Sequence, residues 1–546
     1  GFSGGIIIAW NKGTVDLTCE CIDFQFIHTQ LRMNGGERFM FTAVYASPVE
    51  EVRTSMWNSI RQLAHTIQDA WLLVGDYNDI IGPEEKRGGA PVNPRRCRLF
   101  RERIENCNLF DLGSVGTKFT WKGPIYNNGI RIYERLDRAL SNDLWRINFP
   151  NAIVRTLPRV NFSDHHPLLV MLDANNNGRT DRPFRFESAW QMHKALPKDL
   201  QVWWSQGTSL IDKLGKVEEN LRVWKIHTFG NVRKKKKELL ARLGGIQKKR
   251  ENHDMNCYLD RLEKELQFEL ADVLKSEELI WYQRSWAQWL FDGDRNTKYY
   301  HIKAVNTRRR NKIVMLRNNE GQWIEEDAQL RNMVTSFYKD LFTESNDSPV
   351  SYTMKYGFKP LGVEVGRSLA SEVMNEEIRK ALFDMAAWKA PGPDGYPAGF
   401  YQKNWNLVAD SVYDLVRYMW YHPAEIININ SIDICLIPKI DKPEYVNQFR
   451  LISLCNVSYK ILTKVIVNRL KPFIPNVISP YKTGFVPTRS IHENIVVAQE
   501  MVHIMHKMRG RTGFVAIKVD LAKAYDRLRW SFIAAVLEEI RIFRSW

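Results

Sequence analysis

Short apolar runs bounded by turn residues set the pattern of the first third of the chain. The runs cover residues 5–10, 39–46 and 71–74, and they are rich in β-branched or aromatic side chains. Such runs are typical of strands buried inside a layered sheet. Residues 175–183 are polar and contain Gly and Pro, which predicts a linker. The pattern therefore indicates an α/β domain that ends near residue 174.

Beyond the linker the apolar residues recur at intervals of three and four. They form two stripes: Leu210, Leu214, Val217, Leu221 and Trp224, then Leu259, Leu262, Leu266, Leu270 and Val273. We predict two amphipathic helices that pair with each other. The basic runs 233–237 and 248–250 follow the first stripe. Each run is either a solvated helix face, a contact to RNA or DNA, or a nuclear localisation signal.

The last third combines helices with short strands. Asn375 predicts a helix N-cap, because two glutamates follow it in the positive first turn and Ile378, Leu382 and Met385 would point inward. Two prolines and two glycines within residues 389–395 end this helix. We further expect strands at 435–439 and 447–454, a helix at 459–470, a buried strand at 514–519 and a helix at 521–530.

Composition narrows the class of protein. A chain of 546 residues predicts about three or four domains, and 44% hydrophobic residues exclude a disordered protein. The formal net charge of +16 favours DNA or RNA as partner, because cations placed on phosphates release condensed counterions. An anionic membrane is the rival partner.

Cysteine usage and the chain ends bear on location. Seven irregularly spaced cysteines do not form a disulfide scaffold, and Cys19 and Cys21 have no second pair at zinc spacing, so we expect reduced thiols inside the cell. The sequence shows no signal peptide and no apolar run of about 18 residues, so no membrane partner is expected. Because it begins at Gly1 without methionine, we expect a fragment.

Polar residues gather where the expected strands of the first domain end. Tyr45 closes one strand, and Asp76 and Asn78 follow the next through Gly75. Read singly, this loop is a simple turn. Further candidates are Asp137, Asp164 and His165. Supplied from separate strand ends, this set suits metal-assisted phosphodiester cleavage, whereas His165 alone would more often be a structural histidine.

Together these residues resemble the endonuclease/exonuclease/phosphatase superfamily, in the apurinic-type endonuclease branch carried by non-LTR retrotransposons. The resemblance implies a four-layered α/β sandwich. It implies that Asp76 orients and helps to deprotonate the attacking water, while Asn78 and Tyr45 hold the scissile phosphate. Asp137 would support His165, which stabilises charge on the phosphate, and Asp164 would lie beside the metal ion.

One expected residue has no counterpart in this sequence. Relatives have an Asn-containing strand and a metal-binding glutamate upstream of the stretch that corresponds here to residues 1–5, and no later residue replaces that glutamate. Mg²⁺, or Mn²⁺ in its place, needs one or two well-placed carboxylates to compete with water. We therefore expect little or no nuclease activity from this chain alone.

Residues 518–526 resemble the first catalytic motif of reverse transcriptases of non-LTR retrotransposons (plant-type long interspersed elements). The resemblance makes Asp520 a ligand of two Mg²⁺ ions for in-line displacement and makes Tyr525 a steric gate against ribonucleotides. Read without it, Asp520 would cap the helix expected after it.

The same family supplies readings for four other segments. Residues 389–395 resemble its signature at the start of the polymerase fingers, and 484–494 resemble its template-contacting segment. Lys439 and Arg450 would hold the incoming triphosphate, Arg450 through a bidentate fork; otherwise they are two surface cations. The aromatic and basic stretch 281–311 resembles the segment that joins endonuclease to polymerase, and template RNA binding there is a hypothesis.

The resemblance leads to a three-part α/β and α+β protein. We expect a partial endonuclease/exonuclease/phosphatase-like domain at 1–174, a basic helical connector at 175–360, and a partial reverse transcriptase at 361–546 with fingers and the first palm motif. The second catalytic motif, an Asp-Asp hairpin, should lie beyond Trp546, so polymerisation by this chain alone is not expected. An intact relative would act on DNA and RNA in the nucleus. The alternatives are a non-catalytic nucleic-acid-binding remnant and a phosphoesterase of lipids or small molecules.

Overall fold

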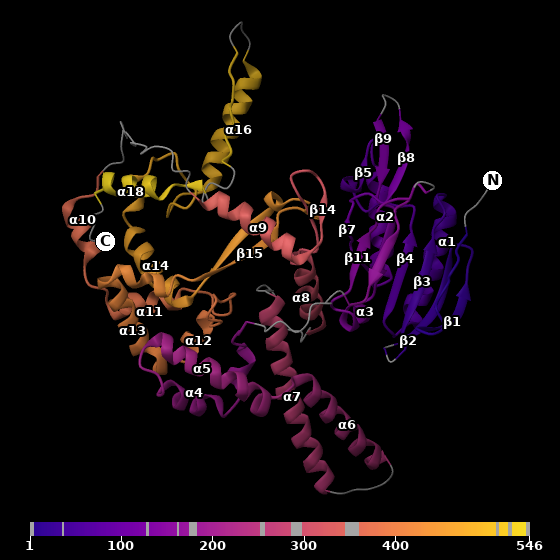
Figure 1. Cartoon of the computed structure of the whole chain (residues 1–546), viewed down its shortest axis with the longest axis horizontal. Helices are drawn as coiled ribbons and strands as arrows, with labels where there is room; N and C mark the ends of the chain where they lie inside the picture. The colour runs from indigo at the N-terminus through magenta and orange to yellow at the C-terminus, as the bar shows by residue number, and fades with distance from the viewer. Residues whose placement is uncertain are drawn as a thin grey trace. The chain divides into compact units, whose positions relative to one another are not determined.

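The computed structural model describes residues 5–541 except 35, 37, 127–129, 161–162, 174–182, 252–256, 286–296, 344–359, 509–512 and 522–526. The chain divides into two compact units (Figure 1). Unit 1 comprises Gly1–Arg182, Arg284–Leu330 and Leu436–Leu451, and unit 2 comprises Pro183–Gln283, Arg331–Cys435 and Ile452–Trp546. The expected linker at 175–183 lies outside the described residues except for Pro183.

The centre of unit 1 is a six-stranded sheet in the order β1-β2-β3-β4-β10-β6. The strands are β1 (Val15–Ile22), β2 (Phe26–Met33), β3 (Arg38–Tyr45), β4 (Trp71–Asp76), β6 (Phe110–Asp111) and β10 (Asp137–Ser141). β3 and β4 are parallel, and the other neighbours are antiparallel. The apolar runs at 39–46 and 71–74 are thus strands, as their composition predicted.

Alternate side chains of β3 and β4 pack into two different hydrophobic cores, because side chains along a strand point to opposite faces of the sheet. On one face Met40 and Leu73 pack against α1 (Glu50–Thr66) and α2 (Pro94–Asn106). On the other face Phe39 and Leu72 pack against α3 (Asp143–Asn148) and a second sheet. That sheet contains β7 (Val115–Gly116), β11 (Ile153–Thr156) and β12 (Leu168–Met171). Helices, sheet and sheet therefore form successive layers, and the fourth layer of the expected sandwich stays a prediction.

The remaining elements of unit 1 include a third small sheet. It consists of β5 (Lys86–Arg87), β8 (Trp121–Tyr126) and β9 (Ile130–Glu134). Further along the chain lie α8 (Thr297–Asn311) and the hairpin of β13 (Leu316–Arg317) and β14 (Trp323–Ile324). The Arg309 guanidinium on α8 donates to the Gly113 carbonyl at 2.7 Å, so α8 is fixed beside β7.

Residues 5–10 do not form the expected strand. They are irregular, and Ile7 is 92% exposed. An apolar run becomes a strand only where a neighbour accepts its backbone hydrogen bonds, and no described strand pairs with this segment. The edge of the sheet is instead β1, whose side chains are mostly exposed.

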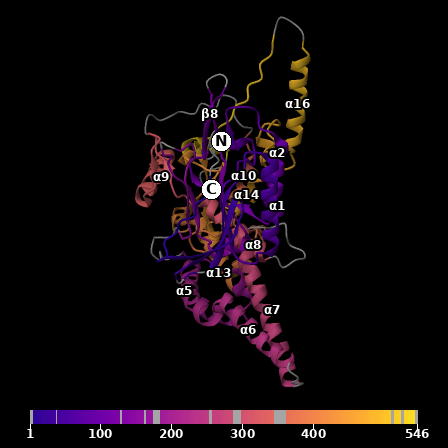
Figure 2. The same ribbon diagram turned by 90° about the vertical axis from the view of Figure 1, so that its right-hand side faces the viewer.

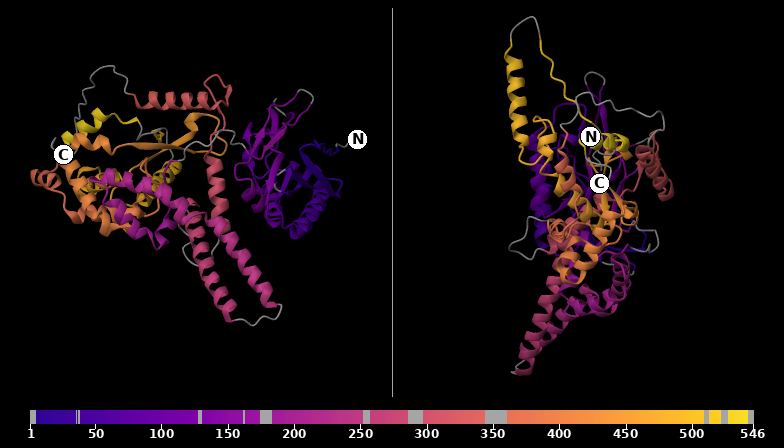
Figure 3. Two further views of the ribbon diagram at one scale, coloured as in Figure 1. Left: turned by 60° about the horizontal axis from the view of Figure 1, so that its bottom comes forward. Right: turned by 90° about the vertical axis from the view of Figure 1, so that its left-hand side faces the viewer.

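Unit 2 is built around one core to which distant segments contribute. Residues 184–190, α4 (Leu196–Trp204) and α5 (Leu210–Trp224) pack with α11 (Asn375–Phe383), α12 (Ala398–Lys403), α13 (Trp405–Tyr421) and α14 (Val457–Leu470), as Figure 3 shows in magenta and orange. All five residues of the first predicted stripe are buried on α5. The start of the expected connector therefore shares its core with the expected fingers.

The second predicted stripe has a different partner from the one expected. α6 (Val232–Glu251) and α7 (Cys257–Ser285) lie side by side (Figure 1, Figure 2). Leu239, Leu243 and Ile246 of α6 pack against Leu266 and Val273 of α7. The helix that pairs with this stripe is thus α6 and not α5, because α5 buries its own apolar face in the larger core. The basic run 233–237 forms the largely exposed first turns of α6.

The C-terminal part of unit 2 follows the expected order of elements. It includes α9 (Asp327–Phe342), α10 (Val363–Ala370), β15 (Ile432–Pro438), β16 (Phe449–Cys455), α16 (Ile491–Lys507) and α18 (Trp530–Glu539), some of which extend into unit 1. β15 and β16 pair with each other, as predicted for 435–439 and 447–454. The N-cap of α11 is Met374 and not Asn375, because the Glu377 carboxylate accepts from the Met374 amide at 3.0 Å.

Residues 514–519 are neither a strand nor buried. They are extended and irregular, and Val515 and Val519 are 85% and 77% exposed. No described strand offers them a partner, which is the same physical reason that leaves residues 5–10 irregular. Of the helix expected at 521–530, residues 522–526 lie outside the described part, and 528–529 are not helical. Among the residues that the structure describes, no helix has the length and apolar content needed to cross a membrane.

Candidate active site

Three of the expected site residues form a row across neighbouring strand ends. Tyr45 at the end of β3 lies opposite Asp76 at the end of β4, and Asp137 at the start of β10 lies opposite Asp76 on the other side. The parallel pairing of β3 with β4 and the antiparallel pairing of β4 with β10 bring these ends to the same edge of the sheet. The fold thus gathers Tyr45, Asp76 and Asp137 at one place.

The turn after β4 requires glycine and orients an amide side chain. A Cβ atom on Gly75 would lie 1.8 Å from the Val44 carbonyl oxygen, so only glycine allows β3 and β4 to approach here. Asn78 has a φ of 48°. Its backbone N–H donates to Asp76 Oδ1 at 2.9 Å, and its side-chain Nδ2 donates to Asp76 Oδ2 at 3.1 Å and to the Ala46 carbonyl at 2.8 Å. Asp76 and Asn78 therefore act as one fixed pair.

His165 completes the cluster from another loop. Its Nδ1–H donates to Asp137 Oδ2 at 2.8 Å, which leaves Nε2 as the other ring nitrogen. The buried Thr120 hydroxyl accepts from the backbone N–H of Asp137 at 2.9 Å and so fixes the start of β10. Asp164 Oδ2 accepts from the indole N–H of Trp121 at 2.9 Å. Asp76, Asn78, Asp137, Asp164 and His165 are thus held close together, and their role as a single site stays a prediction.

The cluster changes the acidity of two members. Burial, and then the negative charge of Asp137, raise the pKa of Asp76 to about 6. Burial lowers the pKa of His165, but the hydrogen bond and charge of Asp137, followed by the charges of Asp76 and Asp164, outweigh burial and raise it above the usual value. The raised pKa of Asp76 places its proton exchange closer to neutral pH than that of an ordinary carboxyl group.

We expect Asp76→Asn to stabilise unit 1 at pH 7 by about 1–2 kcal/mol. The native state binds the Asp76 proton more tightly than the unfolded state, so stability falls as pH rises from about 4 through 6, and the full cost is present at pH 7. Asn carries no charge and removes that cost, although its amide no longer accepts from Asn78 Nδ2. Thermal unfolding at pH 4 and pH 7 measures the effect.

The matched control is Asp69→Asn, which changes an exposed carboxylate paired with Arg38. Its effect should stay within about 0.5 kcal/mol at pH 7. An Asp76→Asn variant no more stable than wild type at pH 7 would contradict the assigned cost of the buried charge.

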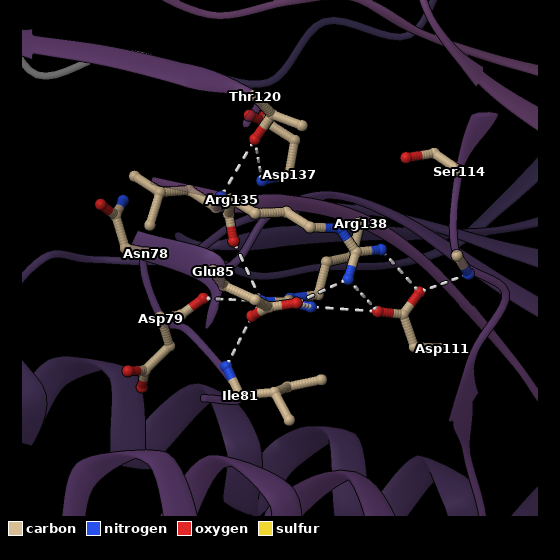
Figure 4. A network of polar contacts seen from close by, with 12 residues as sticks. Asn78, Asp79, Ile81, Glu85, Asp111, Ser114, Thr120, Arg135, Asp137 and Arg138 are labelled. Carbon is tan, nitrogen blue, oxygen red and sulfur yellow. Dashed lines mark hydrogen bonds and ion pairs between the residues drawn. The ribbon is translucent and has the colours of Figure 1, made fainter. Parts of the chain in front are cut away.

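A buried ion-pair network lies next to this row and consists of Glu85, Asp111, Arg135 and Arg138 (Figure 4). Both arginines bridge the two carboxylates, with Arg135 at 2.8 Å from Glu85 and 2.7 Å from Asp111. Arg138 is fully buried and also donates to the Asp79 and Arg135 carbonyls. Burial acts to raise the pKa of Asp111, but the charges of Arg135 and Arg138 hold it well below its usual value. The network fixes the strand that carries Asp137 from both sides.

Sequence reasoning did not identify this network. Arg135 and Arg138 flank Asp137 in the chain, but Glu85 and Asp111 come from two segments that lie more than 20 residues earlier in the chain. One feature of the sequence did indicate buried ion pairs. Two arginines lie at or just before the start of a short strand whose Ala139 and Leu140 predict burial. A charge in a buried strand requires a buried partner.

The candidates of the C-terminal third are not brought together in this way. Asp520 is exposed in the irregular segment, and no described strand supports it, so the predicted emergence from a buried strand is wrong. Tyr525 lies outside the described residues. Lys439 and Arg450 are exposed on the neighbouring β15 and β16 segments, where the Lys439 backbone N–H donates to the Gln448 carbonyl at 2.9 Å. Lys439 and Arg450 belong to unit 1, whereas Asp520 belongs to unit 2.

The donor set of the strand-end cluster suits a hard cation only in part. Within the described residues there is no group of three or more His, Cys, Asp or Glu arranged to hold a metal ion. One oxygen of Asp137 is bonded to His165, and one oxygen of Asp164 is bonded to Trp121. Mg²⁺ commonly binds through one or two carboxylates together with waters and substrate phosphates. The second oxygen of Asp164 fits that mode.

Comparison with known proteins bears first on the C-terminal part. Residues 437–546 match the family model described as reverse transcriptase (RNA-dependent DNA polymerase). The whole chain is 23% identical over 544 residues to the transposon TX1 uncharacterized 149 kDa protein of Xenopus laevis, which covers 94% of this chain and 40% of that protein. This chain is therefore similar to a transposon protein, and its C-terminal part is similar to reverse transcriptases. It spans less than half the length of this relative.

Two solved structures show weak similarity to about 29% of this chain. The endonuclease domain of TRAS1, a telomere-specific non-LTR retrotransposon, has a TM-score of 0.24 at 14% identity, covering 29% of this chain and 68% of that domain. The human Nocturnin catalytic domain has a TM-score of 0.18 at 12% identity, covering 29% of this chain and 62% of its own. These scores are too low to establish a shared fold.

Proposed function

We propose that the strand-end cluster of unit 1 is a Mg²⁺-dependent site for cleaving one strand of DNA, with Mn²⁺ able to replace Mg²⁺. The observation that carries this proposal is the row of Tyr45, Asp76 and Asp137 with His165 bonded to Asp137. Asp76 has a pKa of about 6 and can accept a proton. His165, which Asp137 supports, provides a stabilised positive charge beside it.

Each residue would have its own role in this proposal. Asp76, fixed by Asn78, would orient the attacking water and take its proton. Tyr45 would hold the scissile phosphate through its hydroxyl group. Asn78 would join it only after releasing an amide hydrogen from Asp76 or from the Ala46 carbonyl. His165 would donate through Nε2 to a phosphate oxygen, because Asp137 holds Nδ1. The metal ion, held in part by Asp164, would supply electrostatic stabilisation of the phosphorane charge.

We further propose that residues 361–546 contribute to RNA-directed DNA synthesis primed by the nicked DNA. Asp520 would be a metal ligand, Lys439 and Arg450 would hold the incoming triphosphate, and Tyr525 would exclude ribonucleotides. The match to the reverse transcriptase family over 437–546 and the net charge of +16 support DNA and RNA as partners. The nucleus is the compartment in which such a protein would meet chromosomal DNA.

For this chain by itself we propose nucleic-acid binding with little cleavage. Asp164 has one oxygen left for a metal ion, which gives a weak site until a phosphate of the substrate adds its own oxygens. A non-catalytic nucleic-acid-binding remnant is the second candidate, and the same charge supports it. The alternative of a lipid phosphoesterase has no supporting contact among the described residues.

Plasmid nicking tests the cleavage site directly. At high concentration of the full chain with Mg²⁺, we expect slow conversion of supercoiled to open-circular DNA, which stops on addition of EDTA. His165→Ala should reduce this rate by about 10²-fold or more, because the charge opposite the phosphate is lost.

The matched control is His65→Ala, which removes a histidine from the last turn of α1 and should leave the rate unchanged. Nicking that survives both EDTA and His165→Ala would contradict the proposed site. DNA binding without any nicking above background, unchanged by Asp76→Ala, would favour the non-catalytic remnant.

A further inference from the structure

A cavity on unit 1, separate from the strand-end cluster, is lined mainly by cations. It has a volume of about 490 Å³ and lies between the α3–β11 loop and the C-terminal end of α8. Its charged lining residues are Arg146, Arg308, Arg309 and Lys312, and the lining includes no carboxylate. This volume lies within the range of natural ligand pockets and can admit a nucleotide-sized group.

Arg146 is the residue of this cavity that most clearly lacks a ligand. Its side chain is 1% exposed, and Nη1 donates to the Ala152 carbonyl at 3.0 Å. Its Nε and Nη2 are buried and have no hydrogen-bond partner. A buried charged donor without a partner costs free energy that an anion can recover.

A second arginine adds positive charge to the same cavity. Arg309 donates to the Gly113 carbonyl at 2.7 Å and lines the same cavity. Burial, and then the positive charge of Arg309, lower the pKa of Arg146 to about 10. Burial lowers the pKa of Arg309 to about 10 as well, although Asp111 on the far side opposes this. Two guanidinium groups that repel each other are thus held in one largely buried region.

We propose that this cavity binds a phosphodiester group of a nucleic-acid strand, with Arg308 and Lys312 at the rim and with the buried Arg146 guanidinium adding positive charge behind them. Guanidinium groups match phosphate oxygens in geometry as well as charge. The site extends the nucleic-acid binding in the proposed function but does not take part in cleavage. It would position a strand on the unit that carries the strand-end cluster.

The arginine triplet of α8 offers a matched pair of variants for the test. Arg308 and Arg310 are both exposed on the same helix, but Arg308 lines the cavity whereas Arg310 is paired with Asp441 at 2.9 Å and does not. Fluorescence anisotropy with the full chain and labelled oligonucleotides of equal length, one single-stranded RNA and one duplex DNA, gives affinity against salt concentration.

We expect Arg308→Ala to reduce the slope of log K against log salt by about 0.7 for single-stranded RNA or about 0.9 for duplex DNA. Arg310→Ala should leave the slope nearer to that of wild type. Arg146→Met, which keeps most of the side-chain volume, should lower affinity about tenfold, because a buried positive charge next to the phosphate is lost. Whichever oligonucleotide shows these changes is the strand that occupies the cavity.

Equal effects of Arg308→Ala and Arg310→Ala would overturn the proposal, and so would wild-type affinity in a folded Arg146→Met variant. If Arg146→Met does not fold, the comparison of Arg308 with Arg310 decides the matter alone. A third result would also overturn it: inorganic phosphate raises the melting temperature of the wild-type chain, but the cavity variants bind both oligonucleotides as tightly as wild type. The same measurements in a His165→Ala background separate this site from the proposed cleavage site, because the difference in salt slope between Arg308→Ala and Arg310→Ala should persist there.

Discussion

Arg138→Met should destabilise unit 1 by about 3–5 kcal/mol at neutral pH. Arg138 is fully buried between Glu85 and Asp111, and Met keeps most of its volume but none of its charge. Arg135 alone then faces both carboxylates, and at least one buried negative charge loses its partner. Hydrogen exchange of the β4 and β10 amides in the full chain measures the local loss of stability.

The control for this prediction is the same substitution at an exposed arginine. Arg38 is paired with Asp69 at 3.2 Å, and both side chains are more than half exposed, so Arg38→Met should cost less than about 1 kcal/mol. The pKa of Glu85 is held below its usual value, since the hydrogen bond and charge of Arg138 outweigh burial. Stability from a depressed carboxylate pKa is lost as pH falls, so the difference between wild type and Arg138→Met should shrink below about pH 4. Equal costs for Arg38→Met and Arg138→Met would contradict the role of the network.

Phe186→Ala should destabilise unit 2 by about 3–5 kcal/mol. Phe186 is 1% exposed, and its ring centroid lies 5.0 Å from that of Phe400 and 5.2 Å from that of Trp190. Its backbone N–H donates to the Gly395 carbonyl at 3.0 Å, so the segment after the expected linker is joined directly to the turn at 389–395. Hydrogen exchange should show lost protection in α13 and α14 as well as in α4 and α5.

Phe268→Ala on α7 is the matched control, because that side chain is 75% exposed. Its effect should stay within about 0.5 kcal/mol. If Phe186→Ala loosened only residues 183–229 and left α13 and α14 protected, the connector would be a separate folding unit.

The sequence predicted well those elements whose signal is local. β3, β4, α5 and α14 carry either an uninterrupted apolar run or a complete stripe at helical spacing, and each has a neighbour that covers it. Residues 5–10 and 514–519 carry the same apolar signal, but no strand in the described part of the chain pairs with them, so the prediction of a strand was wrong. Composition describes what a segment can form, whereas pairing depends on the rest of the chain.

The candidate site was predictable to the extent that it lies at strand ends. Tyr45, Asp76 and Asp137 follow or begin recognisable segments, and their register places them in one row. The buried ion-pair network could not be predicted, because Glu85 and Asp111 carry charge and look like surface residues until their partners are known. The cavity at Arg146 could not be predicted either. It forms between α3 and α8, which are separated by more than 140 residues in the chain.

The shared core of unit 2 has a consequence for the order in which the protein is made. Phe186 leaves the ribosome well before Phe400, its partner in that core. At about 5–20 residues per second, the segment from 184 to 229 waits roughly 10–40 s before the chain that covers it has been synthesised. Its aromatic side chains are exposed to solvent during that time. We therefore expect nascent chains that stop before α14 to be bound by chaperones more strongly than the finished polypeptide.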